Sequence, residues 1–313
     1  MKPALLSHLS PFMKILFVLL LVLTCLIIVV MGGVLLTMLQ YHTNMTKAMV
    51  LLSGIDDPSV TSLLKEMQII QSVFLFIVPG FIAGYLFESS GWGYFGMQKK
   101  PGWIVLLLIV FIMFLSLPLV NWMVSLNEMM RLPASLSGLE DWMQSAEEQA
   151  DKITKTFLDV QSFGGFAVNL LMIAIIPAIG EELLFRGLFQ RLFKEWFRNV
   201  HVAIFLSALL FGLVHLQFYG LLPRVMLGVC FGYLYFWTGT IWVPVFAHFL
   251  NNGAAVVISW LSNIGVVQAD YEKIGSTDNA FLIAGSLVFT GMAMYGAFWF
   301  ARIRVSGNPG IRE

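Results

Sequence analysis

The chain has 313 residues, of which 58% are hydrophobic and 12% are charged, and its mean hydropathy is +0.84. This composition is typical of a polytopic membrane protein and argues against a soluble enzyme. The 18 basic and 18 acidic residues cancel to a net charge of zero, so no overall positive field favours a nucleic acid as a partner. Cys25 and Cys230 lie in apolar segments without disulfide-framework or zinc-finger spacing.

Apolar segments bounded by polar or Pro/Gly-containing turns recur along the chain. A helix needs about 20 apolar residues to span a bilayer. Segments of that kind cover residues 12–39, 67–87, 102–125, 162–190, 201–217, 222–238, 241–262 and 279–301. They predict an all-α fold, a polytopic membrane helix bundle with about eight transmembrane helices. The first segment is too long for a signal-peptide core and no convincing small-residue cleavage site follows it, so we expect a retained helix.

The orientation is predicted from the basic residues, which favour the cytoplasmic side of a membrane. With the N-terminus in the cytoplasm, the inside segments hold most of them, namely Lys2, Lys14, Lys99, Lys100, Arg186, Arg191, Lys194, Arg198, Arg302, Arg304 and Arg312. We therefore expect an integral multi-pass protein of a bacterial inner (plasma) membrane with both termini in the cytoplasm.

The longest loop, about 126–161, is too polar to cross a membrane because it carries a run of acids and lysines. Ser137 with Glu140 fits a capping box, so we expect an amphipathic helix near 137–160 on the outer surface. This helix is either a solvated structural element or a lid over a substrate entrance. The residue pattern alone does not decide between the two.

Two adjacent glutamates, Glu181 and Glu182, interrupt the next apolar segment. They follow Pro177 and Gly180, so we expect a kinked helix that aims a carboxylate into a cavity. Adjacent helical residues point ~100° apart, which gives the two glutamates different roles. Glu182 lies four residues before Arg186, the spacing of an intrahelical ion pair, and Glu181 remains the freer carboxylate.

His215 is expected to lie level with Glu181. The midpoint of the two positions is residue 198, inside a polar stretch that must form the turn between two antiparallel helices. His248 follows after enough residues for one helix to cross back and the next to return to a similar depth. Three polar clusters can therefore converge inside the membrane.

His248 and Asn252 are four residues apart and share a helix face, whereas Asn251 is expected to point elsewhere. An imidazole and an amide on one face can donate hydrogen bonds to the oxyanion of acyl transfer, while Glu181 and His215 hold and deprotonate a water. No activated nucleophile is evident in the sequence, because Ser207 lacks an elbow context and neither cysteine is near a histidine.

Each of these residues also has a structural interpretation. His215 can be a hydrogen-bonded packing residue, Glu182 with Arg186 a structural ion pair, and Asn252 an interhelical contact. Charged groups within a membrane are costly, at ~2.5 to 3.5 kcal/mol on insertion scales, so they usually face the bundle interior and have a function there. The hypothesis of a hydrolytic site depends on the whole set and on no single member.

The three motifs resemble those of the CPBP family of intramembrane proteases, which contains the CaaX prenyl proteases of the Rce type and bacterial Abi proteins. Glu181-Glu182-Leu183-Leu184-Phe185-Arg186 is similar to the family's E-E-x-x-x-R motif, Phe211-Gly212-Leu213-Val214-His215 to F-x-x-x-H, and His248-Phe249-Leu250-Asn251-Asn252 to H-x-x-x-N. The intervening Gly228-x-x-x-Gly232 also resembles the family. The resemblance covers about 162–262, which we interpret as a CPBP-like catalytic core between a transmembrane region at 1–161 and a last loop, final helix and cytoplasmic tail at 263–313.

The resemblance implies that Glu181 and His215 activate water, that His248 and Asn252 form the oxyanion hole, and that Glu182 and Arg186 shape the site. The family is often labelled metalloprotease, and Glu181, His215 and His248 could ligate a divalent metal such as zinc. H-E-x-x-H is absent, however, and glutamate with histidine can activate water unaided, so we favour no obligatory metal. The implied substrate is a membrane-associated peptide or protein, including C-terminally prenylated CaaX proteins.

Two rival functions use the same buried polar cluster. In a transporter, the buried Glu, His and Arg would relay protons or bind a solute, although no pseudo-symmetric halves are visible. In a catalytically silent scaffold or immunity protein, the same fold would carry no reaction. The intact motifs favour the enzyme.

Overall fold

The computed structural model describes residues 4–54, 58–88 and 93–306, and every regular element in these ranges is helical. The N-terminal half consists of α1 (Pro11–Gln40), α2 (Met45–Ser53), α3 (Thr61–Ser72), α4 (Val78–Phe87), α5 (Trp103–Leu115), α6 (Leu117–Glu128) and α7 (Ser137–Leu158). The C-terminal half consists of α8 (Phe163–Asn169), α9 (Ile176–Glu182), α10 (Gln190–Phe197), α11 (Val200–Leu213), α12 (Leu221–Thr238), α13 (Trp242–Asn263) and α14 (Ala280–Ser306). The predicted all-α bundle is confirmed.

Six helical stretches in the described part of the chain are long and apolar enough to cross a membrane. A seventh candidate is the pair α5 and α6, which is bent by 45° at its break. The remaining predicted span, at 201–217, corresponds to α11, an apolar helix of 14 residues. At 1.5 Å per residue, α11 is about 21 Å long, shorter than the ~30 Å hydrocarbon core.

The helix that carries the two glutamates is continuous from Phe163 to Phe197. Two π-helical segments, Leu170–Ile175 and Leu183–Phe189, lie on either side of α9. Pro177 lacks an N–H, so the ordinary helical bonding pattern cannot continue through it, and the π-helical segment before it accommodates the change. Two widened turns therefore flank the position of the predicted kink in a continuous helix, and the kink itself stays a prediction.

The turn between this helix and α11 lies where the sequence placed it. Arg198 ends α10 in the left-handed conformation with φ of 54°, and Asn199 caps α11 through the backbone N–H groups of His201 and Val202. α11 then packs closely along α12. Gly228 and Gly232 allow this approach, because a Cβ at Gly228 would stand 2.9 Å from the Cβ of Ala208.

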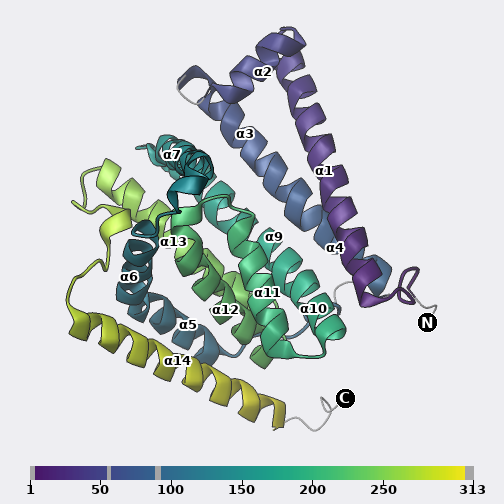
Figure 1. The fold of residues 1–313 in the computed structure, drawn as a ribbon, viewed down its shortest axis with the longest axis vertical. Helices are drawn as coiled ribbons and strands as arrows, with labels where there is room; N and C mark the ends of the chain where they lie inside the picture. Colours follow the sequence, from purple (N-terminus) through teal and green to yellow (C-terminus); the bar gives the residue numbers. More distant parts are fainter. Residues whose placement is uncertain (1–3, 55–57, 89–92, 307–313) are drawn as a thin grey trace.

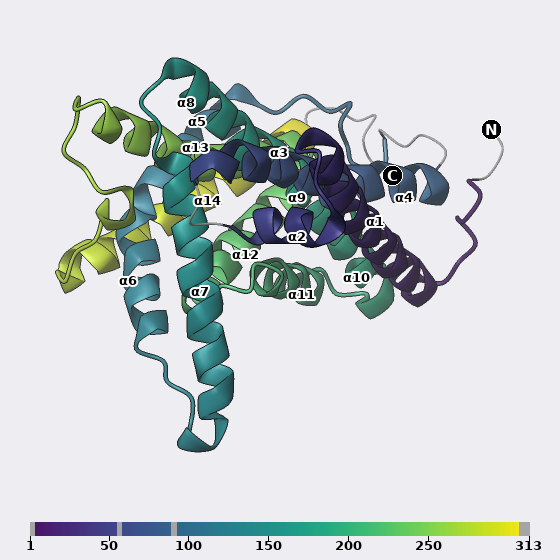
Figure 2. The ribbon, with the colours of Figure 1, turned by 90° about the horizontal axis from the view of Figure 1, so that it is seen from above.

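α7 runs across the direction of the long helices, as Figure 2 shows. The predicted helix is therefore present over Ser137–Leu158, but the predicted capping box is wrong. Ser137 is already the first helical residue and caps nothing, while Glu140 accepts a hydrogen bond from the backbone N–H of Leu132 and pairs with Arg131.

α1 begins and α14 ends at the same end of the molecule, while α2 and α7 lie at the opposite end (Figure 1). A common side for the two ends is what the orientation prediction requires. Two of the basic residues behind that prediction, Lys2 and Arg312, lie outside the described residues. The molecule has one buried apolar cluster around α1, α4 and the glutamate-bearing helix, and a second around α5, α12, α13 and α14.

Candidate active site

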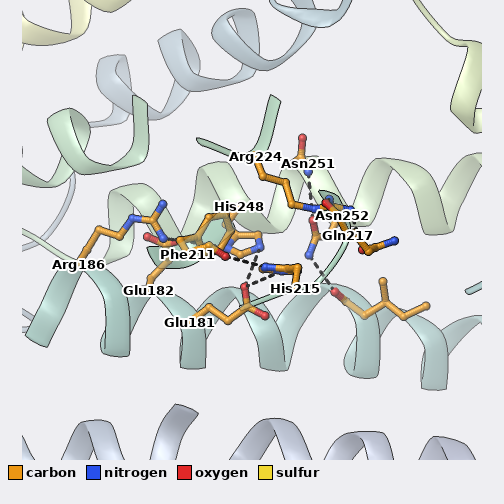
Figure 3. Close-up of polar contacts among 11 residues, drawn as sticks. Glu181, Glu182, Arg186, Phe211, His215, Gln217, Arg224, His248, Asn251 and Asn252 are labelled. Carbon is orange, nitrogen blue, oxygen red and sulfur yellow. Dashed lines mark hydrogen bonds and ion pairs between the residues drawn. The ribbon is translucent and has the colours of Figure 1, made fainter. Parts of the chain in front are cut away.

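Glu181 and Glu182 point in different directions from the C-terminal end of α9 (Figure 3). Glu182 is completely buried, and Glu181 is 8% exposed. Glu182 faces Arg186, whereas Glu181 faces the two histidines. The predicted division between a structural and a freer carboxylate follows from this helical geometry.

Glu182 is held by two donors on one oxygen. Its Oε1 accepts from Arg186 Nη1 at 2.8 Å and from His248 Nδ1 at 2.9 Å. The buried Arg186 also donates to the carbonyl oxygen of Gly228 at 3.2 Å, and its guanidinium lies over the rings of Phe211 and Phe231. Glu182 and Arg186 thus form the predicted pair and also connect it to a catalytic candidate.

His215 lies in the turn just after α11, with its side chain 28% exposed. Its Nδ1 is 2.7 Å from the carbonyl oxygen of Phe211. A carbonyl oxygen can only accept, so Nδ1 carries the hydrogen and the neutral ring has its lone pair on Nε2. That Nε2 is directed at Glu181 Oε2, 3.9 Å away.

His248 enters the same site from α13 and is almost fully buried. Its Nδ1 donates to the carboxylate of Glu182, and its Nε2 lies 3.8 Å from Glu181 Oε2. The ring stacks on Phe231, with 5.6 Å between the centroids. Two imidazole Nε2 atoms therefore converge on one carboxylate oxygen that is buried and has no hydrogen-bond partner among the described residues.

Asn252 lies one turn beyond His248, where its Nδ2 donates to the carbonyl oxygen of Ile173 at 3.1 Å. Asn251 was expected to point elsewhere, and this is wrong. Its Nδ2 donates to Asn252 Oδ1 at 3.1 Å, and both residues line the same cavity. The hydrogen bond between the two amides restrains both side chains.

A cavity of about 750 Å³ leads to this cluster. His215, His248 and Asn252 line it together with Glu147 and Asp151 of α7 and Arg224 of α12. Arg224 donates hydrogen bonds to Gln217, at 2.9 Å to the carbonyl oxygen and 2.6 Å to Oε1. α7 is therefore part of the wall of the cavity.

The three potential metal donors predicted from the sequence are Glu181, His215 and His248. Ligand atoms on one tetrahedral zinc, each ~2.0 to 2.1 Å from it, stand about 3.3 Å apart, less than the 3.8 and 3.9 Å observed from Glu181 Oε2. Within the described ranges, no group of three or more His, Cys, Asp or Glu side chains is arranged to hold a metal. The three donors do not fit a metal in this arrangement.

Sequence reasoning missed several residues that support the site. Gln190 is buried and donates from Nε2 to the carbonyl oxygen of Gly232 at 3.0 Å, one turn beyond the matching bond from Arg186 to Gly228. The four-residue spacing from Arg186 was the available signal. Ser207, considered as a nucleophile and set aside, donates its hydroxyl to the carbonyl oxygen of Phe185 at 2.7 Å.

Comparison with known proteins finds relatives in the same part of the chain. Residues 163–254 match the sequence profile of a family described as "Type II CAAX prenyl endopeptidase Rce1-like". The chain is 36% identical over 135 residues to "Putative membrane peptidase YdiL" of Bacillus subtilis (strain 168), covering 42% of this chain and 51% of that protein. It is 33% identical over 100 residues to "Membrane-embedded CAAX protease MroQ" of Staphylococcus aureus (strain USA300), covering 30% and 40%.

These matches span about half of the curated relatives' lengths or less. No solved structure matches the chain at a comparable level of significance. The matched region holds Glu181, Glu182, Arg186, His215, His248 and Asn252. The region at 163–254, which carries these residues, is therefore similar to Rce1-like proteases of the CPBP family.

Proposed function

We propose that this protein is an intramembrane endopeptidase, a hydrolase that cleaves a peptide bond of a membrane-associated substrate with water activated by Glu181 and His215. The observation that carries this proposal is the convergence of Glu181 Oε2 with the Nε2 atoms of His215 and His248 beside a cavity. The gaps of 3.8 and 3.9 Å are too long for direct hydrogen bonds and suit a bridging water.

The charges of the cluster suggest its protonation state. Arg186 balances Glu182, which leaves the negative charge of Glu181 inside the membrane protein without a permanent partner. One additional proton on His248 makes the cluster neutral, with Nδ1–H donated to Glu182 and Nε2–H directed toward the cavity. His215 then stays neutral with its Nε2 lone pair available to the water.

The reaction follows from these states. Glu181 accepts a proton from the water held at His215 Nε2, and the water oxygen forms a bond to the scissile carbonyl carbon. His248 Nε2–H and the Asn252 amide donate to the resulting oxyanion. The C–N bond then breaks, and the proton taken by Glu181 passes to the leaving amine, so the carboxylate is restored.

The relatives suggest a class of substrate for this protein, and the distribution of basic residues suggests its orientation in a membrane. We propose a membrane-associated peptide or protein, including prenylated chains with a C-terminal CaaX motif, because the description of the matched family and the name of MroQ both specify CAAX proteins. We assign 162–262 as the catalytic core and place the protein in a bacterial inner membrane with both termini in the cytoplasm. Bilayer lipid is its other partner.

The test is cleavage of a quenched fluorescent farnesylated CaaX peptide by the purified protein in detergent. Glu181→Gln keeps the shape of the side chain and removes the base, and His215→Ala removes the second water contact, so each should lower kcat by about 10²- to 10⁴-fold. His201→Ala is the matched control, since His201 is exposed and bonds to Tyr233 away from the cavity.

The same assay with an unprenylated peptide and with a chelator addresses the substrate and the metal. Equal cleavage of both peptides would remove prenylation as a requirement, and loss of activity with chelator, restored by added zinc, would assign a metal role to Glu181, His215 and His248. Wild-type protein that cleaves neither peptide, or a fully active Glu181→Gln variant, would contradict the proposal and favour a transporter or a silent scaffold.

A further inference from the structure

The turn that carries His215 has a strained backbone. Leu216, the next residue, has a positive φ of 54°. A branched residue adopts this left-handed conformation only when its surroundings enforce it, and such residues are common near functional sites. Contacts beyond Leu216 must therefore hold the turn in place.

Three successive residues after Leu216 are each bonded to a different helix. The carbonyl oxygen of Gln217 accepts from Arg224 of α12 at 2.9 Å, and that of Phe218 accepts from Asn127 Nδ2 of α6 at 2.9 Å. The backbone N–H of Tyr219 donates to Glu147 Oε2 of α7 at 3.2 Å. The turn is thus fixed from three directions.

Two further contacts accompany the hydrogen bond from Tyr219 to Glu147 of α7. Trp142 of α7 packs against Phe218, with 5.4 Å between ring centroids. Arg131, in the connection before α7, lies over the ring of Tyr219 and pairs with Glu140 of α7. α7 and the segment before it therefore contact the turn at both Phe218 and Tyr219.

We propose that Glu147 is a positioning residue, which fixes the turn at Tyr219 so that His215 Nε2 faces Glu181. It acts through the backbone and need not touch the substrate. Its effect on rate rests on the proposed peptidase function, whereas its effect on the turn does not.

Among the charged residues near this part of the cavity, Glu147 is the one that bonds to the turn from outside the membrane-spanning segments. Asp151, one turn further along α7, and Glu128 of α6 line the cavity without a hydrogen bond to residues 214–220 in the described structure. Arg224 stabilises the turn from its own helix, through Gln217. Glu147 can therefore be changed while the other two contacts to the turn remain.

The experiment compares Glu147→Ala, Glu147→Gln and Glu148→Ala in the full-length protein. Glu148 is the neighbouring exposed acid and serves as the matched control. Hydrogen–deuterium exchange is followed in a peptide covering residues 214–220, and kcat and KM are measured with the farnesylated peptide. Exchange in the helix at 163–197 and the circular dichroism spectrum report whether each variant is folded.

Glu147→Ala should increase exchange in 214–220 and lower kcat, each by about tenfold, with KM changed less than about twofold. Glu147→Gln should stay within about threefold of wild type in both, because its amide oxygen can still accept from Tyr219 N–H. Glu148→Ala should match wild type. This rescue by glutamine separates a contact to the backbone from a requirement for negative charge.

Unchanged exchange in folded Glu147→Ala would overturn the inference even if the protein is an active protease. A raised KM with unchanged kcat would also overturn it, since that result indicates direct contact with substrate. If the wild type cleaves nothing, the proposed function fails, and increased exchange confined to Glu147→Ala would still support the contact to the turn.

Discussion

At the scale of single residues, Arg186 stabilises the fold and also holds Glu182, the carboxylate that bonds to His248. It is buried and provides the only permanent positive charge in contact with Glu182 within the described structure. Arg186→Met would leave Glu182 as an uncompensated buried charge, at a cost of about 3 to 5 kcal/mol. We therefore expect the apparent midpoint of thermal unfolding in detergent to fall by about 10 °C, followed by tryptophan fluorescence.

The double variant Glu182→Gln/Arg186→Met separates the two roles of this pair. Removing both charges should recover much of the lost stability, while peptide cleavage stays low because the neutral amide no longer supplies the negative charge that favours the proposed proton on His248. Lys47→Met, at an exposed position on α2, is the control. Arg186→Met that is no less stable than this control would contradict the structural role.

The convergence of the site could be predicted from the sequence because the registry of two helices joined by a short turn is a local property. Placing the turn at residue 198 was sufficient to bring Glu181 and His215 level, and the structure has 3.9 Å between their facing atoms. The pairing of Glu182 with Arg186 followed from four-residue spacing in the same way. The hydrogen bond from His248 to Glu182 could not be predicted from spacing, because it depends on how α13 is rotated against α9.

The wrong predictions concern contacts that have no periodic signal. The capping box failed because Glu140 bonds to Leu132 and Arg131 on the preceding segment instead of closing on its own helix. The contribution of Asn127 and Glu147 to the His215 turn could not be predicted, since these residues come from helices that are distant in sequence. Side chains that bond to backbone groups can do so at any separation along the chain.

At the scale of elements, α7 is sensitive to pH because two of its acids face the cavity. Burial raises the pKa of Glu147, against the opposing effect of its hydrogen bond from Tyr219, and burial also raises the pKa of Asp151. A carboxyl whose pKa is raised on folding binds protons more tightly in the folded state, so its contribution to stability decreases as pH rises from the unfolded pKa through the folded one.

We therefore expect Glu147→Gln/Asp151→Asn to gain stability relative to wild type as the pH rises from about 4 upward, until both acids are ionised in the folded protein. The measurement is the difference between the two thermal unfolding midpoints at a series of pH values. Glu148→Ala, which changes an exposed acid on the same helix, should show no such trend. A difference in midpoint that is constant with pH, or that changes in the opposite direction, would mean that folding does not raise the pKa of these two carboxyl groups.

At the scale of the whole molecule, the cavity and the two ends of the described chain lie on different sides. α7 and the segment Tyr271–Lys273 contribute to the cavity wall, and α7 lies at the end opposite the start of α1 and the end of α14 (Figure 1). If both termini are cytoplasmic, the part of the cavity that α7 lines faces away from the cytoplasm. The side from which a substrate enters is therefore tied to the orientation of the chain.

Cysteine labelling in intact cells tests this orientation. In a background with Cys25 and Cys230 replaced by alanine, Ser145→Cys places a thiol on the exposed face of α7, and Lys100→Cys places one in the connection before α5. A membrane-impermeant maleimide should label Ser145→Cys in intact cells and Lys100→Cys only after permeabilisation, because the positive-inside rule puts Lys99 and Lys100 in the cytoplasm. The reverse pattern would invert the chain, and the cavity would then receive its peptide from the cytoplasmic side.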